Sequence, residues 1–252
     1  MPDSLSSAID ARPFVCKTKD GRSMHFTHGE TQSRMRLRDP DALDLEYTRT
    51  MMGFVLFHLQ PDRIAMVGLG GGSMAKYCYR HLTRSRMVVV EINPHVIALR
   101  DDFRVPADDQ RFSVVLGDGA AFLASQPAQH DVVLVDGFVS HGLPTRLCSQ
   151  SFYDDCRQSL RPGGIAVVNL HTSHPDFEQQ VDRLRRSFGA AVLLVPDDDH
   201  CNTIVFAFAD PTAIDRLGPG LMRPPACLDS AGANQLLGAF SRIASAVKSL
   251  RL

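Results

Sequence analysis

The chain has 252 residues, of which 44% are hydrophobic, a size and composition that suit one large domain with a small appendage. Its 27 Lys and Arg against 28 Asp and Glu leave a net charge of -1, so no strong field is present to attract nucleic acid. The apolar runs are far shorter than the ~20 residues of a membrane-spanning helix, so we also expect no membrane partner.

Two features of the sequence favour a cytoplasmic location. The N-terminal residues Met1-Pro2-Asp3-Ser4 lack a basic segment followed by an apolar stretch, the pattern of a secretory signal peptide. The six cysteines form no C-x-x-C pair, and reduced thiols are the ordinary state of cysteine in the cytosol. We therefore expect a cytoplasmic protein.

Residues 1–60 predict a small β appendage followed by a linking helix. Strand-like residues flank Asp20-Gly21, a strong hairpin turn signal, and Asp39-Pro40 interrupts the extended pattern. The predicted elements are strands at 14–19, 23–26 and 34–37 and a helix at 45–59 with a mostly apolar face.

Strands and helices alternate in the second predicted unit, residues 61–252. Most of its strands are continuous apolar runs, as expected of strands buried on both faces of a sheet. We predict seven strands, at 63–68, 87–92, 112–117, 131–136, 164–170, 190–195 and 203–209, with helices at 73–82, 94–102, 119–125, 149–160 and 175–187. Such alternation indicates an α/β fold with a doubly wound, mostly parallel sheet. Only residues 196–202 separate the last two strands, too few for a helical crossover, so the final strand is predicted to be antiparallel.

The C-terminal region predicts a connector and a packing helix. Residues 210–232 are rich in Pro and Gly, which favours a loop. A helical stripe follows, formed by Leu236, Leu237, Phe240, Ile243, Val247 and Leu250. Such stripes usually pack on the core of their own domain, and binding of a partner is the alternative.

The segment 64–73 is typical of a buried strand that runs into a glycine-rich turn and then a helix. The turn is Gly68-Leu69-Gly70-Gly71-Gly72, followed by Ser73. Glycine lets the backbone approach a ligand closely, and the start of the helix offers free N–H groups to it. Nicotinamide-binding folds favour G-x-G-x-x-G, and Ser73 replaces the last glycine of that pattern, which disfavours an oxidoreductase.

An acidic residue lies at the C-terminal end of each of the next three predicted strands. Glu91 can accept hydrogen bonds from both hydroxyls of a ribose, and Asp118 can accept from an adenine amino group or cap a helix. Asp136 ends the fourth strand before Gly137 and is either a functional acid or part of a turn. Because open α/β sheets bind ligands at the carboxyl ends of their strands, these acids predict a nucleoside site.

Together these motifs resemble the class I S-adenosylmethionine-dependent transferases, and most closely the spermidine synthase family. The resemblance rests on residues 67–73, 90–97, 117–122, 131–136, Phe152-Tyr153 and 160–164, and upstream on 31–33 and 45–52. It implies a class I methyltransferase (Rossmann-like) fold. It also implies S-adenosylmethionine or its decarboxylated form as co-substrate, an amine as acceptor, no metal, and a homodimer.

The resemblance also implies roles for particular residues. In the family, the acid matching Glu91 holds the ribose, the acid matching Asp118 holds the adenine, and the acid matching Asp136 helps deprotonate the attacking amine. Gln32 and Tyr47 resemble the family's contacts near the sulfonium side chain and the amine. The implied catalytic residues are thus Asp136 and Tyr47, and the implied donor-binding residues are Gln32, Gly68, Gly70, Gly72, Glu91, Ile92, Asp118, Gly119 and Asp136.

Two positions depart from the pattern of spermidine synthases. Gly71 stands where that family has an Asp for the aminopropyl amine, and Val139 stands where it has an Asp for the diamine. Each missing carboxylate removes a charge-assisted hydrogen bond worth about 1.5–3 kcal/mol. We therefore expect a less cationic acceptor, unless Glu30, Asp44 or Glu46 refills the pocket.

Two alternatives remain at the level of sequence, a small-molecule methyltransferase and a catalytically silent nucleoside-binding scaffold. Other polar residues carry weaker predictions. His171 and His174 have the spacing H-x-x-H without a third ligand and are expected to be capping or surface residues. His141 follows Asp136 in a loop and is a candidate acceptor contact. Residues 197–200 are expected to form a solvated turn.

Overall fold

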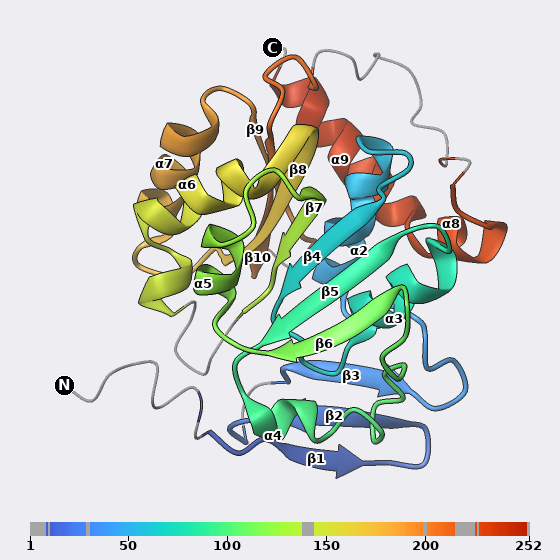
Figure 1. Cartoon of the computed structure of the whole chain (residues 1–252). Coiled ribbons are helices and arrows are strands. Elements are labelled where there is room, and N and C mark those ends of the chain that lie inside the picture. Colours follow the sequence, from blue (N-terminus) through green and yellow to red (C-terminus); the bar gives the residue numbers. More distant parts are fainter. Residues whose placement is uncertain are drawn as a thin grey trace.

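The computed structural model describes residues 9, 11–28, 31–137, 144–198, 201–214, 225 and 227–250, and Figure 1 shows their arrangement. A seven-stranded sheet runs through the molecule with helices on both faces, and a three-stranded sheet lies beyond one of its ends. No helix within the described ranges is long and apolar enough to span a membrane.

The large sheet has the strand order β6-β5-β4-β7-β8-β10-β9. Strands β4 to β8 pair in parallel, whereas β10 is antiparallel to both β8 and β9. The prediction of a doubly wound, mostly parallel sheet with an antiparallel final strand is therefore confirmed. The strands are β4 (Arg63–Val67), β5 (Arg86–Glu91), β6 (Phe112–Leu116), β7 (His130–Val135), β8 (Leu160–His171), β9 (Val192–Pro196) and β10 (Asn202–Phe208).

Continuous apolar runs form these central strands because both faces of the sheet are buried. In β4, Ile64 and Met66 belong to one hydrophobic cluster, whereas Ala65 and Val67 belong to the cluster on the opposite face. Successive side chains of a strand point to opposite faces, so a strand with two covered faces needs an apolar residue at every position.

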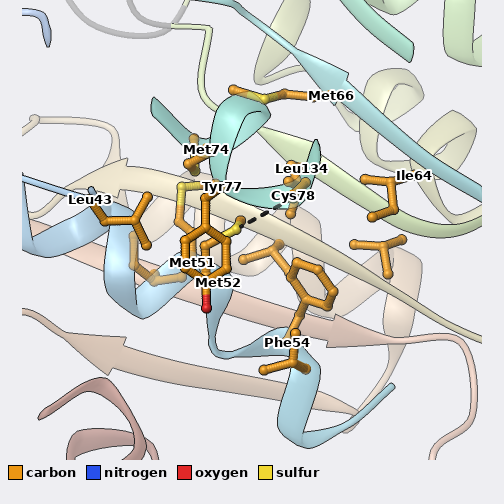
Figure 2. Close-up of a cluster of buried hydrophobic side chains, with 14 of the residues drawn as sticks. Leu43, Met51, Met52, Phe54, Ile64, Met66, Met74, Tyr77, Cys78 and Leu134 are labelled. Carbon is orange, nitrogen blue, oxygen red and sulfur yellow. Dashed lines mark hydrogen bonds between the residues drawn. The ribbon is translucent and has the colours of Figure 1, made fainter. Parts of the chain in front are cut away.

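Two groups of helices cover the sheet. One face carries α5 (Gly119–Ala124), α6 (Gln150–Ser159) and α7 (Phe177–Phe188), and the other carries α2 (Glu46–Met52), α3 (Ser73–His81), α8 (Ser230–Gln235) and α9 (Leu237–Ser249). Figure 2 shows how α2 and α3 meet, with Met51 and Met52 next to Tyr77 and Cys78. The sulfur atoms of Cys78 and Met52 lie 3.7 Å apart. This packing fixes α3, the helix that follows the glycine loop, against α2.

The N-terminal sheet consists of β1 (Phe14–Lys17), β2 (Gly21–His25) and β3 (Ser33–Arg36), all antiparallel, as predicted. Met24 and Met35 from this sheet pack into the same cluster as Met66 and Met74. A common hydrophobic core therefore joins the small sheet to the larger unit. The division of the chain between residues 60 and 61 stays a prediction.

The predicted helix at 94–102 is wrong beyond its first turn. The helix α4 covers only Pro94–Ile97, and Asn93 caps it by accepting hydrogen bonds from His95 N and Val96 N. Turns follow, and the backbone reaches a left-handed conformation at Arg104, where φ is 54°. The chain turns back because Phe103 is buried in the core.

Two other helices differ from their predictions. The helix predicted at 45–59 is α2 followed by a 3-10 turn, η1 (Gly53–Leu56), which packs against α9. The C-terminal stripe begins at Leu236, between α8 and α9, and otherwise belongs to α9 and its C-cap, and α9 packs on β9 as predicted. Leu237 and Leu250 are 50% and 54% exposed, so their assignment to the packing face is wrong. They are the first residue and the C-cap of α9.

Candidate active site

The glycine-rich loop after β4 lies at the carboxyl edge of the sheet, between the ends of β5 and β7. Gly68 N donates to Val90 O, and Asp136 N donates to Val67 O, both at 2.9 Å. The φ of Gly68 is 93°, and a Cβ atom there would lie 2.3 Å from Asp136 O. Only glycine permits this approach, which brings the acids after neighbouring strands to one place.

Glu91, at the end of β5, holds the loop through backbone hydrogen bonds. Leu69 N donates to Glu91 Oε2 and Asn93 N donates to Oε1, both at 2.8 Å. Burial raises the pKa of Glu91, and the backbone donors at Leu69 and Asn93 oppose that rise. The backbone N–H groups of Ile92 and Gly70 oppose that rise as well, so four backbone donors act on this carboxylate.

Asp118 has two partners in this structure. Its Oδ1 accepts from Ala120 N at 2.8 Å and so caps α5, the local role that the sequence allowed. Its Oδ2 lies 3.1 Å from Nη2 of Arg146, a partner that the sequence did not indicate. The carboxylate also lines the cavity described below, so capping and ligand binding are compatible.

Asp136, after β7, is held by two side chains from distant segments. Tyr47 OH donates to Oδ2 at 3.1 Å, and Asn169 Nδ2 donates to Oδ1 at 2.9 Å. Burial raises the pKa of Asp136, and the hydrogen bonds from Asn169 and Tyr47 lower it in part. Burial also raises the pKa of Tyr47 well above its ordinary value, so the phenol stays protonated and remains a donor. Asn169 was not among the predicted site residues, and its only signal is a polar residue within an apolar strand.

A cavity of about 530 Å³ connects these groups. Gly72, which was predicted with the site residues, is the N-cap of α3 and does not line it. The other predicted residues all do, namely Gln32, Tyr47, Gly68, Gly70, Glu91, Ile92, Asp118, Gly119 and Asp136. The cavity is thus large enough for a nucleoside, and the buried residue Asp136 is part of its lining.

At Gly71 there is no room for the acid that spermidine synthases carry. A Cβ atom there would lie 2.5 Å from Ser33 Oγ and 2.8 Å from Phe103 Cδ1. Real Cβ contacts are not this short, so Ser33 of β3 and the core residue Phe103 close this position. The other departure, Val139, and the candidate His141 lie outside the described residues.

The acids proposed to refill the pocket do so only in part. Glu46 lines the cavity, but its carboxylate pairs with Arg49 at 2.7 Å and with Arg242. Asp44 pairs with Arg34 and Arg36 at 2.8 and 3.1 Å and is not among the lining residues. Glu30 lies outside the described residues.

The prediction of a solvated turn at 197–200 is wrong for its first residue. Asp197 is only 3% exposed and lines the cavity, whereas Asp198 is 71% exposed at its side chain and pairs with Arg242 at 2.9 Å. His171 also lines the cavity, but His174 does not. Within the described part of the chain, no group of three or more His, Cys, Asp or Glu residues could hold a metal ion.

The fold and the site together define a class I methyltransferase-like protein with a nucleoside pocket at the carboxyl edge of its sheet. The family model "Spermine/spermidine synthase domain" matches residues 44–191. The chain therefore belongs to the spermine/spermidine synthase family.

Relatives in sequence carry the name polyamine aminopropyltransferase. The protein from Chromobacterium violaceum is 36% identical over 80% of this chain and 78% of its own length. The protein from Neisseria meningitidis is 37% identical over 81% of this chain and 79% of its own length.

Solved structures share the fold. A probable spermidine synthase from Corynebacterium glutamicum superimposes with a TM-score of 0.68 at 22% identity, covering 79% of this chain and 77% of the other. A spermidine synthase in complex with the transition-state analogue AdoDATO gives 0.67 at 15% identity, covering 89% and 88%. Human methyltransferase-like protein 13 in complex with SAH gives 0.59 at 21% identity, covering 80% and 93%. These similarities confirm the predicted fold class.

Proposed function

We propose that this chain is a polyamine aminopropyltransferase, which moves the aminopropyl group of decarboxylated S-adenosylmethionine to a small-molecule amine. The observation that carries this proposal is the position of Asp136. Its carboxylate is held by Tyr47 and Asn169 and lines the same cavity as the nucleoside-binding acid Glu91. The relatives that share 36–37% of the sequence bear this name.

The donor fits along the carboxyl edge of the sheet. We assign the ribose hydroxyls to Glu91 and the adenine amino group to Asp118, and both residues line the cavity. Leu69, Ile92 and Gly119 line the same cavity and offer apolar and backbone surface to the nucleoside. This placement points the sulfonium and its alkyl chain toward Asp136.

Asp136 supplies the chemistry that an amine acceptor needs. A primary alkylamine has a pKa of about 10 and is protonated at neutral pH, so its lone pair must be freed first. Asp136 takes that proton. Its raised pKa narrows the difference in pKa between the ammonium group and the carboxyl group. The hydrogen bonds from Tyr47 and Asn169 fix the orientation of the carboxylate toward the cavity.

The transfer itself needs no cofactor, because every bond, electron pair and proton is accounted for by the two reactants and Asp136. The nitrogen lone pair forms a C–N bond to the carbon next to sulfur, and the C–S bond breaks with its electron pair left on sulfur. The products are methylthioadenosine and a secondary ammonium, and the proton on Asp136 passes to solvent. Because the sulfonium is a good leaving group, much of the rate comes from holding the two reactants in line.

Product analysis tests this function. Purified protein is incubated with putrescine (butane-1,4-diamine) and either decarboxylated S-adenosylmethionine or S-adenosylmethionine. We expect methylthioadenosine and an aminopropylated amine from the decarboxylated donor. S-adenosylhomocysteine formed from the second donor would instead identify a methyltransferase, and nucleoside binding without any product would favour a scaffold.

We further propose that the protein is cytoplasmic and that it is a homodimer, the oligomeric state that the family resemblance implies. All six cysteines are free, which suits a reducing compartment. The chain mass is 27.7 kDa, so light scattering of the eluted protein distinguishes a dimer from a monomer of that mass.

A further inference from the structure

Building on the proposed function, we propose that Ser33 and the start of α3 bind the far end of the donor's alkyl chain. This site accepts the amino-acid end of intact S-adenosylmethionine as well as the aminopropyl end of its decarboxylated form. The protein then has a second activity, the transfer of a 3-amino-3-carboxypropyl group to its amine acceptor.

The glycine loop connects the ribose site to the small N-terminal sheet. The donor's sulfur is attached to the 5′ carbon of the ribose, which we assigned to Glu91, and Leu69 N of the loop donates to Glu91 at 2.8 Å. Two residues further along, a Cβ atom on Gly71 would lie 2.5 Å from Ser33 Oγ of β3. The helix α3, which follows the loop, packs against β3 (Figure 1). The hydroxyl of Ser33 therefore lies beside the position at which spermidine synthases carry an Asp.

Ser33 is a buried polar residue whose hydroxyl lacks a protein partner. The residue is 7% exposed and lines the cavity that contains Glu91 and Asp136. Within the described ranges of the chain, its Oγ makes no hydrogen bond. A buried hydroxyl without a partner is unfavourable, so we expect a ligand to supply the missing hydrogen bond. A hydroxyl can donate to a carboxylate and can also accept from an ammonium group.

The start of α3 offers backbone donors at the same place. Gly72, its N-cap, directly follows Gly71, and among the described residues no side chain caps this helix. Ser73 and Met74, the first two residues of α3, line the cavity. The N–H groups at the start of a helix lack partners within the helix and attract anions. These N–H groups and the hydroxyl of Ser33 together stabilise a carboxylate at the end of the donor chain.

The small sheet gives the cavity no charged group among its described residues. Its strands and the connection between β2 and β3 contribute uncharged lining residues, namely Met24, Phe26, Thr31, Gln32 and Ser33. An Asp at position 71 attracts the ammonium of the decarboxylated donor and repels the carboxylate of the intact donor, and such a repulsive element creates specificity. The uncharged Ser33 has neither effect, so the site distinguishes only weakly between the two donors.

The second activity uses the same reacting atoms as aminopropyl transfer. The acceptor ammonium gives a proton to Asp136, and its nitrogen lone pair forms a C–N bond to the methylene carbon next to sulfur. The C–S bond breaks with its electron pair left on sulfur, and the proton on Asp136 passes to solvent. The products are methylthioadenosine and a secondary ammonium that carries the 3-amino-3-carboxypropyl group. The α-ammonium and α-carboxylate of the donor take no part in the step.

Calorimetric titration without an acceptor tests the site. S-adenosylmethionine and its decarboxylated form carry the chain, whereas methylthioadenosine lacks it and reports the nucleoside site alone. The Kd values of the two donors for the wild type should lie within about 10-fold of each other, and a larger preference for the decarboxylated donor would overturn the proposal. In Ser33→Asp the added carboxylate should increase that preference about 10-fold or more, the effect of one charge-assisted hydrogen bond. An equal ratio of Kd values in Ser33→Asp and the wild type would overturn the role of Ser33.

A control and a second variant complete the binding test. Thr27→Asp adds the same charge at an exposed position between β2 and β3 and should leave the ratio unchanged. Ser33→Ala covers the case in which Ser33→Asp does not fold. Loss of the hydroxyl should weaken both donors about 5-fold, while the affinity for methylthioadenosine stays unchanged. An equal loss for all three ligands would show that Ser33 only supports the loop, and would overturn its contact with the donor chain.

Product analysis separates the second activity from the proposed function. The wild type incubated with S-adenosylmethionine and butane-1,4-diamine should yield a modified amine whose mass includes the carboxyl group. Absence of this amine, while the decarboxylated donor gives the aminopropylated amine, would overturn the second activity alone. Absence of any product from the decarboxylated donor would overturn the proposed function, and the donor-chain site would still be supported by the binding ratios.

Discussion

The donor and acceptor ends of the cavity are built in different ways. At the donor end, backbone N–H groups of Leu69, Asn93 and the first turn of α5 hold Glu91 and Asp118, and one side chain, that of Arg146, pairs with Asp118. At the acceptor end, Tyr47 of α2 and Asn169 of β8 hold Asp136 through their side chains. The donor end therefore depends on local chain geometry, and the acceptor end depends on the packing of segments far apart in sequence.

The largest effect on nucleoside binding is expected from Glu91→Ala at the donor end. This change removes the ribose acceptor and also the partner that fixes Leu69 N and Asn93 N. With two charge-assisted hydrogen bonds lost to the ligand, methylthioadenosine should bind about 100-fold more weakly. Calorimetric titration measures this, with exposed Glu178→Ala on α7 as the matched control. Unchanged affinity in Glu91→Ala would remove the ribose assignment.

Gly71→Asp tests whether the donor end can accept the acid found in spermidine synthases. Because Ser33 Oγ and Phe103 Cδ1 occupy the space of a Cβ atom, the added side chain must displace the loop. We expect donor affinity to fall about 10-fold, a cost of about 1–3 kcal/mol typical of overpacking. Ser33→Gly in the same chain should recover part of the loss. A gain in affinity from Gly71→Asp alone would show that the loop yields easily.

Tyr47→Phe tests the side-chain network of the acceptor end through the pH profile. The hydrogen bond from Tyr47 lowers the pKa of Asp136, so its removal raises that pKa. A higher pH is then needed to ionise the base, and the acidic limb of kcat/KM should move to higher pH. The matched control is Tyr79→Phe, whose hydroxyl donates to exposed Asp109. An acidic limb at the same pH in Tyr47→Phe and the wild type would exclude Asp136 as the titrating base.

The smallest effect on activity is expected from substitution of His130, which lies at the opposite end of β7 from Asp136. Burial lowers the pKa of His130 to about 4, and its two ring nitrogens have no hydrogen-bond partner within the described residues. The unfolded histidine has a pKa of about 6.5, so the unfolded chain binds more protons between these values. The neutral, buried His130 therefore makes its full contribution to stability above about pH 6.5, and this contribution is lost as the pH falls toward 4.

His130→Phe should remove that contribution while kcat at neutral pH stays unchanged. Urea unfolding at pH 7 and at pH 4.5 measures the free energy of unfolding at each pH. Its decrease from pH 7 to pH 4.5 should be smaller in the variant than in the wild type. An equal loss in both proteins would assign the acid sensitivity to other groups, including the carboxyls of the cavity.

Much of the donor end could be predicted from the sequence. Gly68, Glu91 and Asp118 follow apolar strands at regular intervals, and the topology of a parallel sheet brings the ends of such strands together. The same local logic predicted the seven strands and the antiparallel β10. It failed at residues 98–102, because the burial of Phe103 turns the chain after one turn of helix.

The acceptor end was harder to predict because its contacts depend on strand order. Asn169 contacts Asp136, and Asp197 lines the same cavity, because β8, β10 and β9 succeed one another at that side of the sheet. A run of three aspartates is typical of a solvated turn, and nothing in the run itself indicates that Asp197 is buried while Asp198 is exposed. A polar residue within or just after a buried strand is the one signal that could have drawn attention to Asn169 and Asp197.

The most direct test of this account is the single-turnover rate of methylthioadenosine formation from bound decarboxylated S-adenosylmethionine and putrescine. The rate in Asp136→Asn should fall about 10³-fold, within the range for loss of a general base. Nucleoside affinity should be unchanged, since Glu91 and Asp118 remain in place. Equal rates in the wild type and Asp136→Asn, at equal nucleoside affinity, would contradict the central claim that Asp136 deprotonates the acceptor.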